Sequence, residues 1–385
     1  MNTVSRGSKR RPRKLKKRIK MKDIDYGLLC GILILLFIGI IMVYSSSSYF
    51  ALYQDKIEDA HYYFIKEITW AIVGVVGMLV TMSIDYHIYK KWIPYFVIFT
   101  FIALVLVLFM GVNINGATRW IRLGPLSFQP SELAKYVLVL YLALLIDRRK
   151  DKIKKFKEGT IFYLAIAASF AVLILAGKNL SITAIVMMVA FIMILVGGAK
   201  ISHLLSLVPV GLAVGLALIF TQSYRLDRLT TFLNPWADPS GDSYQLIQSL
   251  YALGSGGVFG SGLGNSRQKA LFMPEPHNDF IFAIIGEELG LIGCIAIILL
   301  FMFIVIKGVS IAIKARDNYG FLISIGIISV IAIQAIINIA VVTGSMPVTG
   351  VPMPFISYGG TSLVFNLGAM GILLNISRQS KEEEK

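Results

Sequence analysis

The sequence is poor in charged residues and cysteine, and each scarcity excludes a class of protein. Charged side chains make up 15% of the 385 residues and hydrophobic ones 56%, whereas soluble domains carry about 25% charged residues. The two cysteines, Cys30 and Cys294, both lie in apolar runs, so we expect neither a disulfide framework nor a cysteine metal site. Long polar connections are also scarce. We therefore predict an all-α polytopic membrane protein that forms one unit.

The positive charge is concentrated at the start of the chain. The net charge is +15, and 11 of the 37 Lys and Arg residues lie within residues 1–22. This basic tail, residues 1–24, has no aromatic residues on which bases would stack, so we expect no nucleic-acid partner. A tail next to anionic lipid is the simpler interpretation. The first apolar run is long enough to span the membrane and to be retained.

Ten apolar runs have spanning or near-spanning length and lie within residues 25–378. They fall at about 26–46, 64–84, 92–112, 129–146, 160–177, 180–199, 202–221, 279–307, 320–343 and 355–376. The Lys and Arg bias predicts that both termini, including the charged segment 379–385, are cytoplasmic. The 58 residues between the seventh and eighth runs, 221–278, then form a large extracellular loop.

Several cations in the outer loops oppose that bias and point to an anionic partner such as a diphosphate. They are Arg119, Arg122, Lys178, Arg225, Arg228, Arg267 and Lys269. The alternative is that they pair with Asp227, Asp238 or Glu275, or reach lipid phosphates.

The outer segment 115–135 has features of both structure and function. Gly116, Gly124 and Pro125 predict a tight re-entrant turn, and Trp120 is suited to the membrane interface.

Its second half predicts a helix that starts at Pro130. Glu132 and Lys135 fall on one face of that helix, near or within the membrane. They are candidates for a substrate contact or for a structural ion pair.

The long loop predicts a short amphipathic helix over Ser243–Leu253, lying on the membrane surface. The glycine-rich stretch Gly254–Ser266 follows. Its backbone amides are candidates for binding a phosphate, and a flexible hinge is the alternative.

Asp279 closes the long loop where the next helix begins. Asp is common as a helix cap, which is one interpretation. The other is a proton acceptor or cation site, because Glu287 and Glu288 follow eight and nine residues later. We interpret His277 first as a solvated loop residue and keep it as a candidate contact. The uncharged last loop, 343–362, is expected to form a pocket wall that includes Ser357.

These blocks, in this order, resemble the SEDS family, whose FtsW, RodA and SpoVE proteins polymerise cell-wall glycan. The resemblance covers residues 25–378 and is closer to the FtsW and SpoVE branch. It rests on NGATRWI, QPSELAK, NPWADP, GSGGVFGSGLGNS, PEPHNDFIFAIIGEELG and VTGVPMPFISYGGTS. By matching position, Asp279 looks like the family's essential carboxylate and Trp120 like the tryptophan of its second extracellular loop. The sequence GKNLS at 177–181 departs from the QPDLGT-like block of many members, so no role for an acid is expected there.

The resemblance implies ten transmembrane helices in a bacterial plasma membrane and a peptidoglycan glycosyltransferase that joins lipid II units into a glycan strand. It also implies a class B penicillin-binding protein transpeptidase and division or elongation proteins as partners. The transfer inverts the configuration at the anomeric carbon and releases undecaprenyl diphosphate, with Asp279 as the base. An ordinary Asp pKa of about 3.9 is low for this role, so we expect that burial raises it or that the proton moves late.

Ten residues are candidate substrate contacts in this interpretation. They are Trp120, Arg119, Arg122, Glu132, Lys135, Arg225, Arg228, Lys269, His277 and Ser357. A divalent cation, Mg²⁺ or Mn²⁺, held by Asp279 or Glu288 stays open. Two alternatives also stay open: a flippase for lipid II, and a scaffold that binds the transpeptidase without catalysis.

Overall fold

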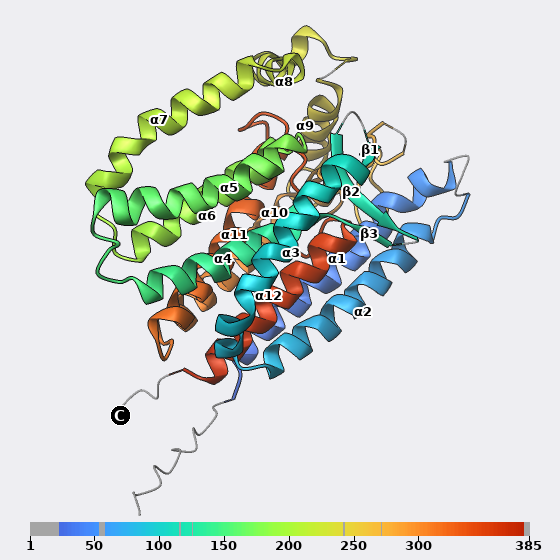
Figure 1. Cartoon of the computed structure of the whole chain (residues 1–385). Coiled ribbons are helices and arrows are strands. Elements are labelled where there is room, and N and C mark those ends of the chain that lie inside the picture. The colour runs from blue at the N-terminus through green and yellow to red at the C-terminus, as the bar shows by residue number, and fades with distance from the viewer. Residues whose placement is uncertain are drawn as a thin grey trace, which may run out of the picture.

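The computed structural model of the chain describes residues 23–53, 58–114, 117–124, 126–241, 243–270 and 272–380. Residues 1–22 of the basic tail lie outside this range, as do Gly116 and Pro125. In the described part, α-helices run almost throughout (Figure 1). They are α1 (Tyr26–Leu52), α2 (Tyr62–Ser83), α3 (Tyr89–Met110), α4 (Pro130–Arg148), α5 (Phe162–Ala176), α6 (Leu180–Val196), α7 (Ile201–Phe220), α8 (Ser223–Leu233), α9 (Tyr244–Gly256), α10 (Ile281–Ile313), α11 (Asn318–Val342) and α12 (Gly360–Arg378).

The prediction of an all-α polytopic membrane protein is confirmed. Within the described residues, eight helical spans are long and apolar enough to cross a membrane: α1, α2, α3 with the turn before it (Tyr86–Met110), α5 with the turn before it (Phe156–Ala176), α7, α10, α11 and α12. The run predicted at 180–199 is α6, which has 17 residues. The run predicted at 129–146 is α4, whose ends carry charged residues. The number of ten spans therefore stays a prediction.

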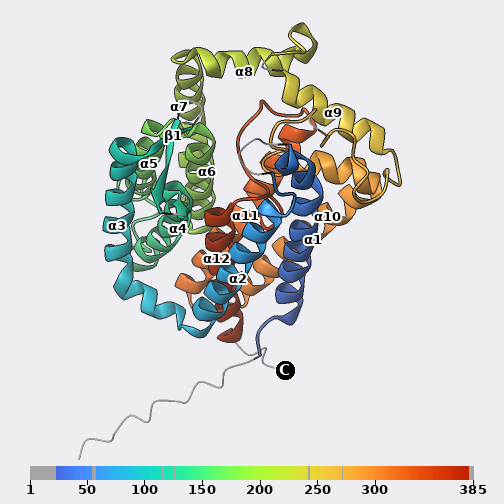
Figure 2. The same ribbon diagram turned by 90° about the vertical axis from the view of Figure 1, so that its right-hand side faces the viewer.

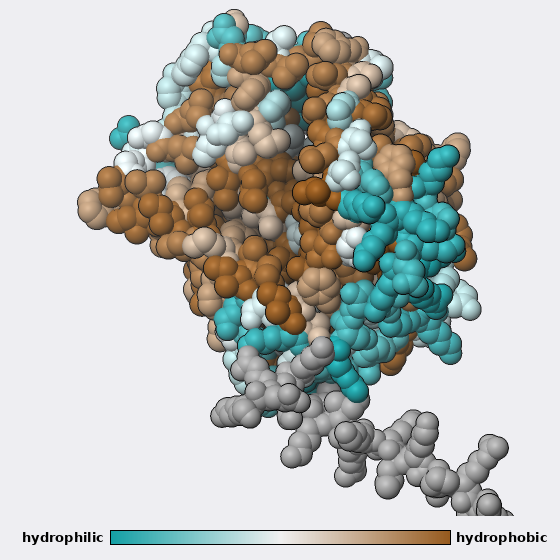
Figure 3. All heavy atoms as spheres, turned by 90° about the vertical axis from the view of Figure 1, so that its left-hand side faces the viewer, coloured by the Kyte–Doolittle hydropathy of each residue, from teal (hydrophilic) through white to brown (hydrophobic). Residues whose placement is uncertain are grey.

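Burial separates central from peripheral helices. α4, α11 and α12 are buried along most of their length, and α2 packs along α12. α7 lies at the edge of the bundle, and Leu204 is the one described residue of α7 that is buried (Figure 1). Hydrophobic residues cover a broad area of the face drawn in Figure 3. Such an apolar surface fits a protein that has lipid as its solvent.

The segment after α3 differs from the predicted re-entrant turn, because it forms a three-stranded antiparallel sheet. Strands β1 (Val112–Ile114), β2 (Ala117–Leu123) and β3 (Leu126–Phe128) lie in that order. β2 reads ATRWIRL, which is rich in residues that favour strands. Gly124 has a φ of +62° at the β2–β3 turn, a conformation that glycine adopts without strain. The prediction that Pro130 starts α4 is confirmed.

The first part of the loop 221–278 is helical. It contains α8, a short 3₁₀ turn (Pro235–Ala237) and α9, which is the helix predicted near 243–253. Figures 1 and 2 show α8, α9 and the sheet gathered toward the end of the bundle opposite the C-terminus. α9 packs along α10 with Leu246, Ile247 and Ala252 buried, so it is more enclosed than a surface helix.

Candidate functional site

A cleft of about 630 Å³ opens where the sheet, α8 and the start of α10 meet. It is lined by β2, the start of α6, α8, residues 275 and 279, and residues 346–350. Its charged side chains are Arg119, Lys178, Arg225, Arg228, Glu275 and Asp279. Trp120 also lines it. The structure thus brings together five of the residues predicted for the site from separate parts of the sequence.

Asp279 does not cap α10. The helix begins at Ile281, its cap position is Phe280, and no side chain caps it. Instead, Asn338 of α11 donates hydrogen bonds to the Asp279 carbonyl (2.7 Å) and the Val351 carbonyl (2.9 Å). The capping interpretation of Asp279 is therefore wrong for this structure, because the residue lies one position too early in the chain.

The carboxylate of Asp279 has the protonation behaviour of a base. A Cβ atom placed on Gly350 would lie 3.3 Å from Asp279 Oδ2, so the carboxylate is close to the last loop. Burial, and then the negative charge of Glu275, raise the pKa of Asp279 from 3.8 to about 6, against the opposing charges of Arg228 and Arg119. A base with this pKa is mostly ionised at neutral pH and accepts protons more strongly than a free Asp.

Arg119 and Arg228 are the cations that act on Asp279. Arg119 donates to the Lys178 carbonyl, while its Nε is buried and has no hydrogen-bond partner in the described part of the chain. Burial lowers the pKa of Arg119 below its ordinary value, and the negative charge of Asp279 opposes that effect. Arg228 is exposed and donates to the Val348 carbonyl (3.1 Å). The two guanidinium groups line the cleft and place positive charge beside Asp279, which favours binding of an anion there.

Arg225 lines the cleft, and its guanidinium already donates hydrogen bonds to other residues of the chain. It donates to the Leu218 carbonyl near the end of α7 (2.7 Å) and to the Tyr224 hydroxyl (3.0 Å). The side chain is buried, and it joins α8 to α7. Its first role is therefore to hold α8 over the cleft.

Lys178 and Glu275 also line the cleft. Lys178 is one of the outer-loop cations that point to an anionic partner, and Glu275 was considered only as an ion-pair partner for them. Both are non-glycine residues with positive φ, +58° and +45°. Glu275 Oε2 accepts a hydrogen bond from Asn278 Nδ2 (2.7 Å), which holds the turn. In the sequence, the two prolines that flank Glu275 indicate a turn, but they give no signal of a positive φ.

Other predicted contacts lie away from the cleft. Arg122 is exposed and does not line the cleft. Lys135 and Glu132 are buried and pair with each other at 2.8 Å, as in the structural alternative. Ser357 is buried, and its hydroxyl accepts from the Met353 amide (2.8 Å). The structure does not bring these side chains to Asp279.

His277 is buried, so the interpretation as a solvated loop residue is wrong. Its ring packs against Phe50, Tyr63 and Tyr358, with ring centroids 4.2–5.6 Å apart. Burial lowers the pKa of His277 to about 3, so the ring is neutral. Tyr358 donates its amide proton to the His277 carbonyl (2.9 Å), which joins the loop before α10 to the last loop.

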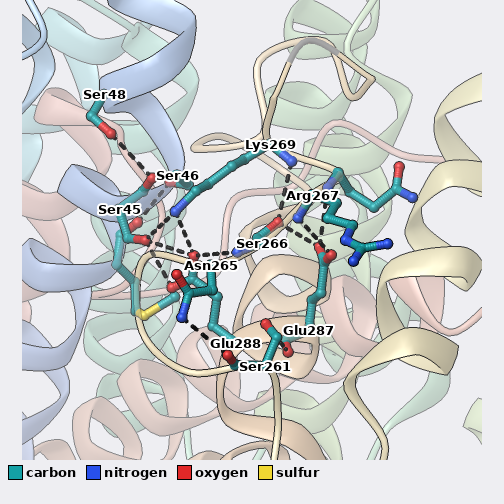
Figure 4. Close-up of polar contacts among 12 residues, drawn as sticks. Ser45, Ser46, Ser48, Ser261, Asn265, Ser266, Arg267, Lys269, Glu287 and Glu288 are labelled. Carbon is teal, nitrogen blue, oxygen red and sulfur yellow. Dashed lines mark hydrogen bonds and ion pairs between the residues drawn. The ribbon is translucent and has the colours of Figure 1, made fainter.

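The glycine-rich stretch does not line the cleft. Its amides at Ser261 and Gly262 donate to the carbonyls of Glu287 and Glu288, so they are not available to a phosphate. Lys269 is also absent from the cleft, because it pairs with Glu288 at 2.7 Å (Figure 4). Among the described residues, no group of three or more His, Cys, Asp or Glu side chains could hold a metal ion. Asp279, Glu287 and Glu288 therefore do not form a joint cation site.

Comparison with known proteins gives the family. The profile of the FtsW, RodA and SpoVE cell cycle proteins matches residues 26–382. The chain belongs to the FtsW/RodA/SpoVE family. It is 44% identical to stage V sporulation protein E of Bacillus subtilis (strain 168) over 91% of this chain and 95% of that protein. It is 39% identical to a probable peptidoglycan glycosyltransferase FtsW of Geobacter sp. (strain M18) over 94% and 99% of the two chains.

Solved structures agree with this membership. A chain from a peptidoglycan synthase complex superposes with a TM-score of 0.73 at 25% identity, covering 92% of this chain and 98% of that one. The rod shape determining protein RodA of Thermus thermophilus has a TM-score of 0.66 at 24% identity and shares the fold over 94% of this chain and 98% of its own. The chain is thus a FtsW/RodA/SpoVE family member along nearly its whole described length.

Proposed function

We propose that this chain is a peptidoglycan glycosyltransferase that polymerises lipid II at the outer face of the membrane. The FtsW relatives carry that activity in their names, and the chain spans almost all of their length. The single observation that supports the proposal most strongly is the position of Asp279. Its carboxylate does not cap a helix, has a pKa of about 6, and lies in a cleft that Arg119 and Arg228 also line.

The geometry suits an inverting transfer. In the proposed step, the 4-hydroxyl oxygen of the acceptor sugar attacks the anomeric carbon of the donor, and the bond from that carbon to the diphosphate breaks. The hydroxyl proton passes to Asp279. The bonding electrons leave with undecaprenyl diphosphate, whose negative charge Arg119 and Arg228 stabilise. Trp120 forms part of the wall against which a sugar would lie.

A divalent cation that assists the transfer is a secondary proposal. Mg²⁺ or Mn²⁺ would neutralise charge on the diphosphate. Asp279 is the one protein ligand that we propose for it. Glu288 is bonded to Lys269 and Ser45, so most ligands would come from the diphosphate and water.

The membrane orientation and partner are part of the same proposal. The cleft lies on the side that we assign to the outside, and both termini are proposed to be cytoplasmic. We propose a class B penicillin-binding protein transpeptidase as partner, within a division or elongation complex. The similar chain from a peptidoglycan synthase complex, in which polymerisation and crosslinking are coordinated, supports this choice.

Purified protein tests the function. With lipid II supplied in detergent, a polymerase makes glycan strands that appear as a ladder on a gel, and it does so faster when the transpeptidase is added. A flippase would make no strand but would move lipid II across vesicles, and a scaffold would do neither. The described structure does not favour a transport path, because Glu132 and Lys135 pair with each other while Glu288 pairs with Lys269. Lipid II movement without strand synthesis would overturn the proposal.

A further inference from the structure

Helix α10 is broken near its start, and the glycine-rich stretch is bonded to the break. Gly290 has a φ of +66° and interrupts the helical conformation. Four backbone hydrogen bonds of 2.9–3.2 Å join residues 257–262 to residues 287–292 on both sides of Gly290. These bonds satisfy backbone groups that the break leaves without helical partners. The stretch is therefore a docked segment of the fold, and its backbone follows α10 closely.

Two carboxylates beside the break bind the next residues of the loop. Glu287 accepts hydrogen bonds from the amides of Arg267 (2.7 Å) and Gln268 (3.3 Å) and from the Ser266 hydroxyl (Figure 4). Glu288 forms an ion pair with Lys269 at 2.7 Å. All these carboxylate contacts are to a single turn of the loop, residues 266–269.

The same cluster reaches α1 through Ser45. The Ser45 hydroxyl lies 2.7 Å from both oxygens of Glu288, and Lys269 Nζ lies 3.0 Å from that hydroxyl (Figure 4). Glu288, Lys269 and Ser45 are all buried. A buried ion pair contributes little net stability but defines position closely, because either charge alone would be costly. We call Lys269, Glu287, Glu288 and Ser45 the clamp.

The clamp closes a loop in the chain, and Asp279 lies inside that loop. Lys269 and Glu288 are 19 residues apart, and Asp279 is ten residues after the first and nine before the second. At the middle of the loop, Asn338 and Tyr358 hold the backbone of residues 277–279. Among the described residues, no side-chain hydrogen bond joins the two ends to α11. The clamp ties them to each other and to α1, and the backbone bonds to residues 257–262 hold the second end as well.

We propose that the clamp positions Asp279 for glycosyl transfer, by fixing both ends of the segment that carries it against α1 and α10. Its members are positioning residues and do not contact the substrate. This proposal rests on the proposed function.

The chain contains a matched control pair. Lys307 and Asp25 form an ion pair at 3.4 Å that joins the same two helices, α10 and α1. Lys307 is 19 residues beyond Glu288, which places it about 28 Å away along a helix. Removing this pair changes the same helix contact at the end far from Asp279.

The experiment compares Lys269→Met/Glu288→Gln with Asp25→Asn/Lys307→Met in the purified full chain. Both double variants remove both charges of a pair, so neither leaves an unpaired buried charge. Polymerisation kinetics and amide hydrogen exchange of residues 272–280 are measured for each. We expect the clamp variant to lose about 10–100-fold in kcat, because displacements near 1 Å have effects of this size, with KM changed less than about twofold. Exchange of residues 272–280 should rise. The control should match the wild type in both measurements.

A wild-type kcat in the clamp variant, or unchanged exchange, would overturn the proposal. An equal loss of kcat and rise in exchange in the control would also overturn it, because the effect would then be general loosening. If the clamp variant does not accumulate, Ser45→Ala tests the proposal in its place. This variant removes one hydroxyl from α1 and should lower kcat several-fold without changing KM. Failure of the proposed function is distinguishable, because the wild type would then make no strand, or Asp279→Asn would make strand at the wild-type rate, while exchange of residues 272–280 still reports on the clamp.

Discussion

The pH dependence of polymerisation should follow the ionisation of Asp279. With a pKa of about 6, about nine-tenths of Asp279 is ionised at pH 7 and about one-tenth at pH 5, so kcat/KM should fall roughly tenfold across that interval. An Asp with an ordinary pKa would stay ionised over the same range. The assay is initial-rate strand synthesis from lipid II, with protein integrity checked at each pH.

Glu275→Gln tests whether Asp279 is the titrating group, because it should shift the pH profile in a known direction. The Glu275 charge raises the pKa of Asp279, so removing it should lower that pKa and move the falling limb of the profile to lower pH. Arg228→Gln should do the reverse, because Arg228 lowers the same pKa.

Asp238→Asn serves as the control for both variants. Asp238 is an exposed acid of the same loop that accepts a hydrogen bond from the Gly241 amide, which Asn can also accept. Its profile should match the wild type. A flat profile between pH 5 and 7, or shifts opposite to these, would refute the assignment of Asp279 as the titrating base.

Three further predictions concern stability and topology. Lys269→Met alone should lower the free energy of unfolding by about 3–5 kcal/mol, measured by thermal unfolding in detergent, because it leaves a buried carboxylate unpaired; a loss below 1 kcal/mol would contradict the buried pair. Gly290→Ala should destabilise the folded protein by at least about 1–3 kcal/mol, since a Cβ would lie 2.4 Å from the Gly260 amide and the Val258 carbonyl. The control Gly211→Ala lies on the open surface of α7 and should be neutral or stabilising. Equal effects of the two would argue against the break in α10. A cysteine at Ser240 should react with an impermeant thiol reagent on wall-free cells and one at Lys152 should not; the opposite pattern would invert the topology.

Hydrophobic length and a few local signals were enough to predict most of the fold. Apolar runs located the long helices, and Pro130 marked the start of α4. The sheet after α3 was missed because its strands are three to seven residues long and lie between membrane helices, where no long alternating pattern can develop. The break in α10 was also missed, since Gly290 is compatible with an unbroken apolar run.

Contacts distant in the sequence explain the errors in the site. In the sequence, Lys269 is a candidate diphosphate ligand because it is a cation in an outer loop. Its partners Glu288 and Ser45 are 19 and 224 residues away, so only the folded chain shows that its charge is engaged. Asp279 and Trp120 could be chosen through family resemblance, and the cleft places them together.

Asp279→Asn affects stability and activity in opposite directions. The folded-state pKa of this acid is raised, so its contribution to stability is present below pH 3.8 and is lost as pH rises through about 6. At pH 7 the ionised group thus costs the fold at most about 3 kcal/mol. Asn avoids that cost, and no helix cap is lost, so the variant should be at least as stable as the wild type.

The most direct test of the account is the polymerisation rate of purified Asp279→Asn with lipid II and the transpeptidase at pH 7. Asn cannot accept the proton, and loss of a general base typically costs 10²–10⁴-fold in rate. We expect normal membrane levels, normal partner binding, a thermal midpoint no lower than that of the wild type, and almost no glycan strand. Strand synthesis near the wild-type rate would contradict the central claim that Asp279 is the catalytic base.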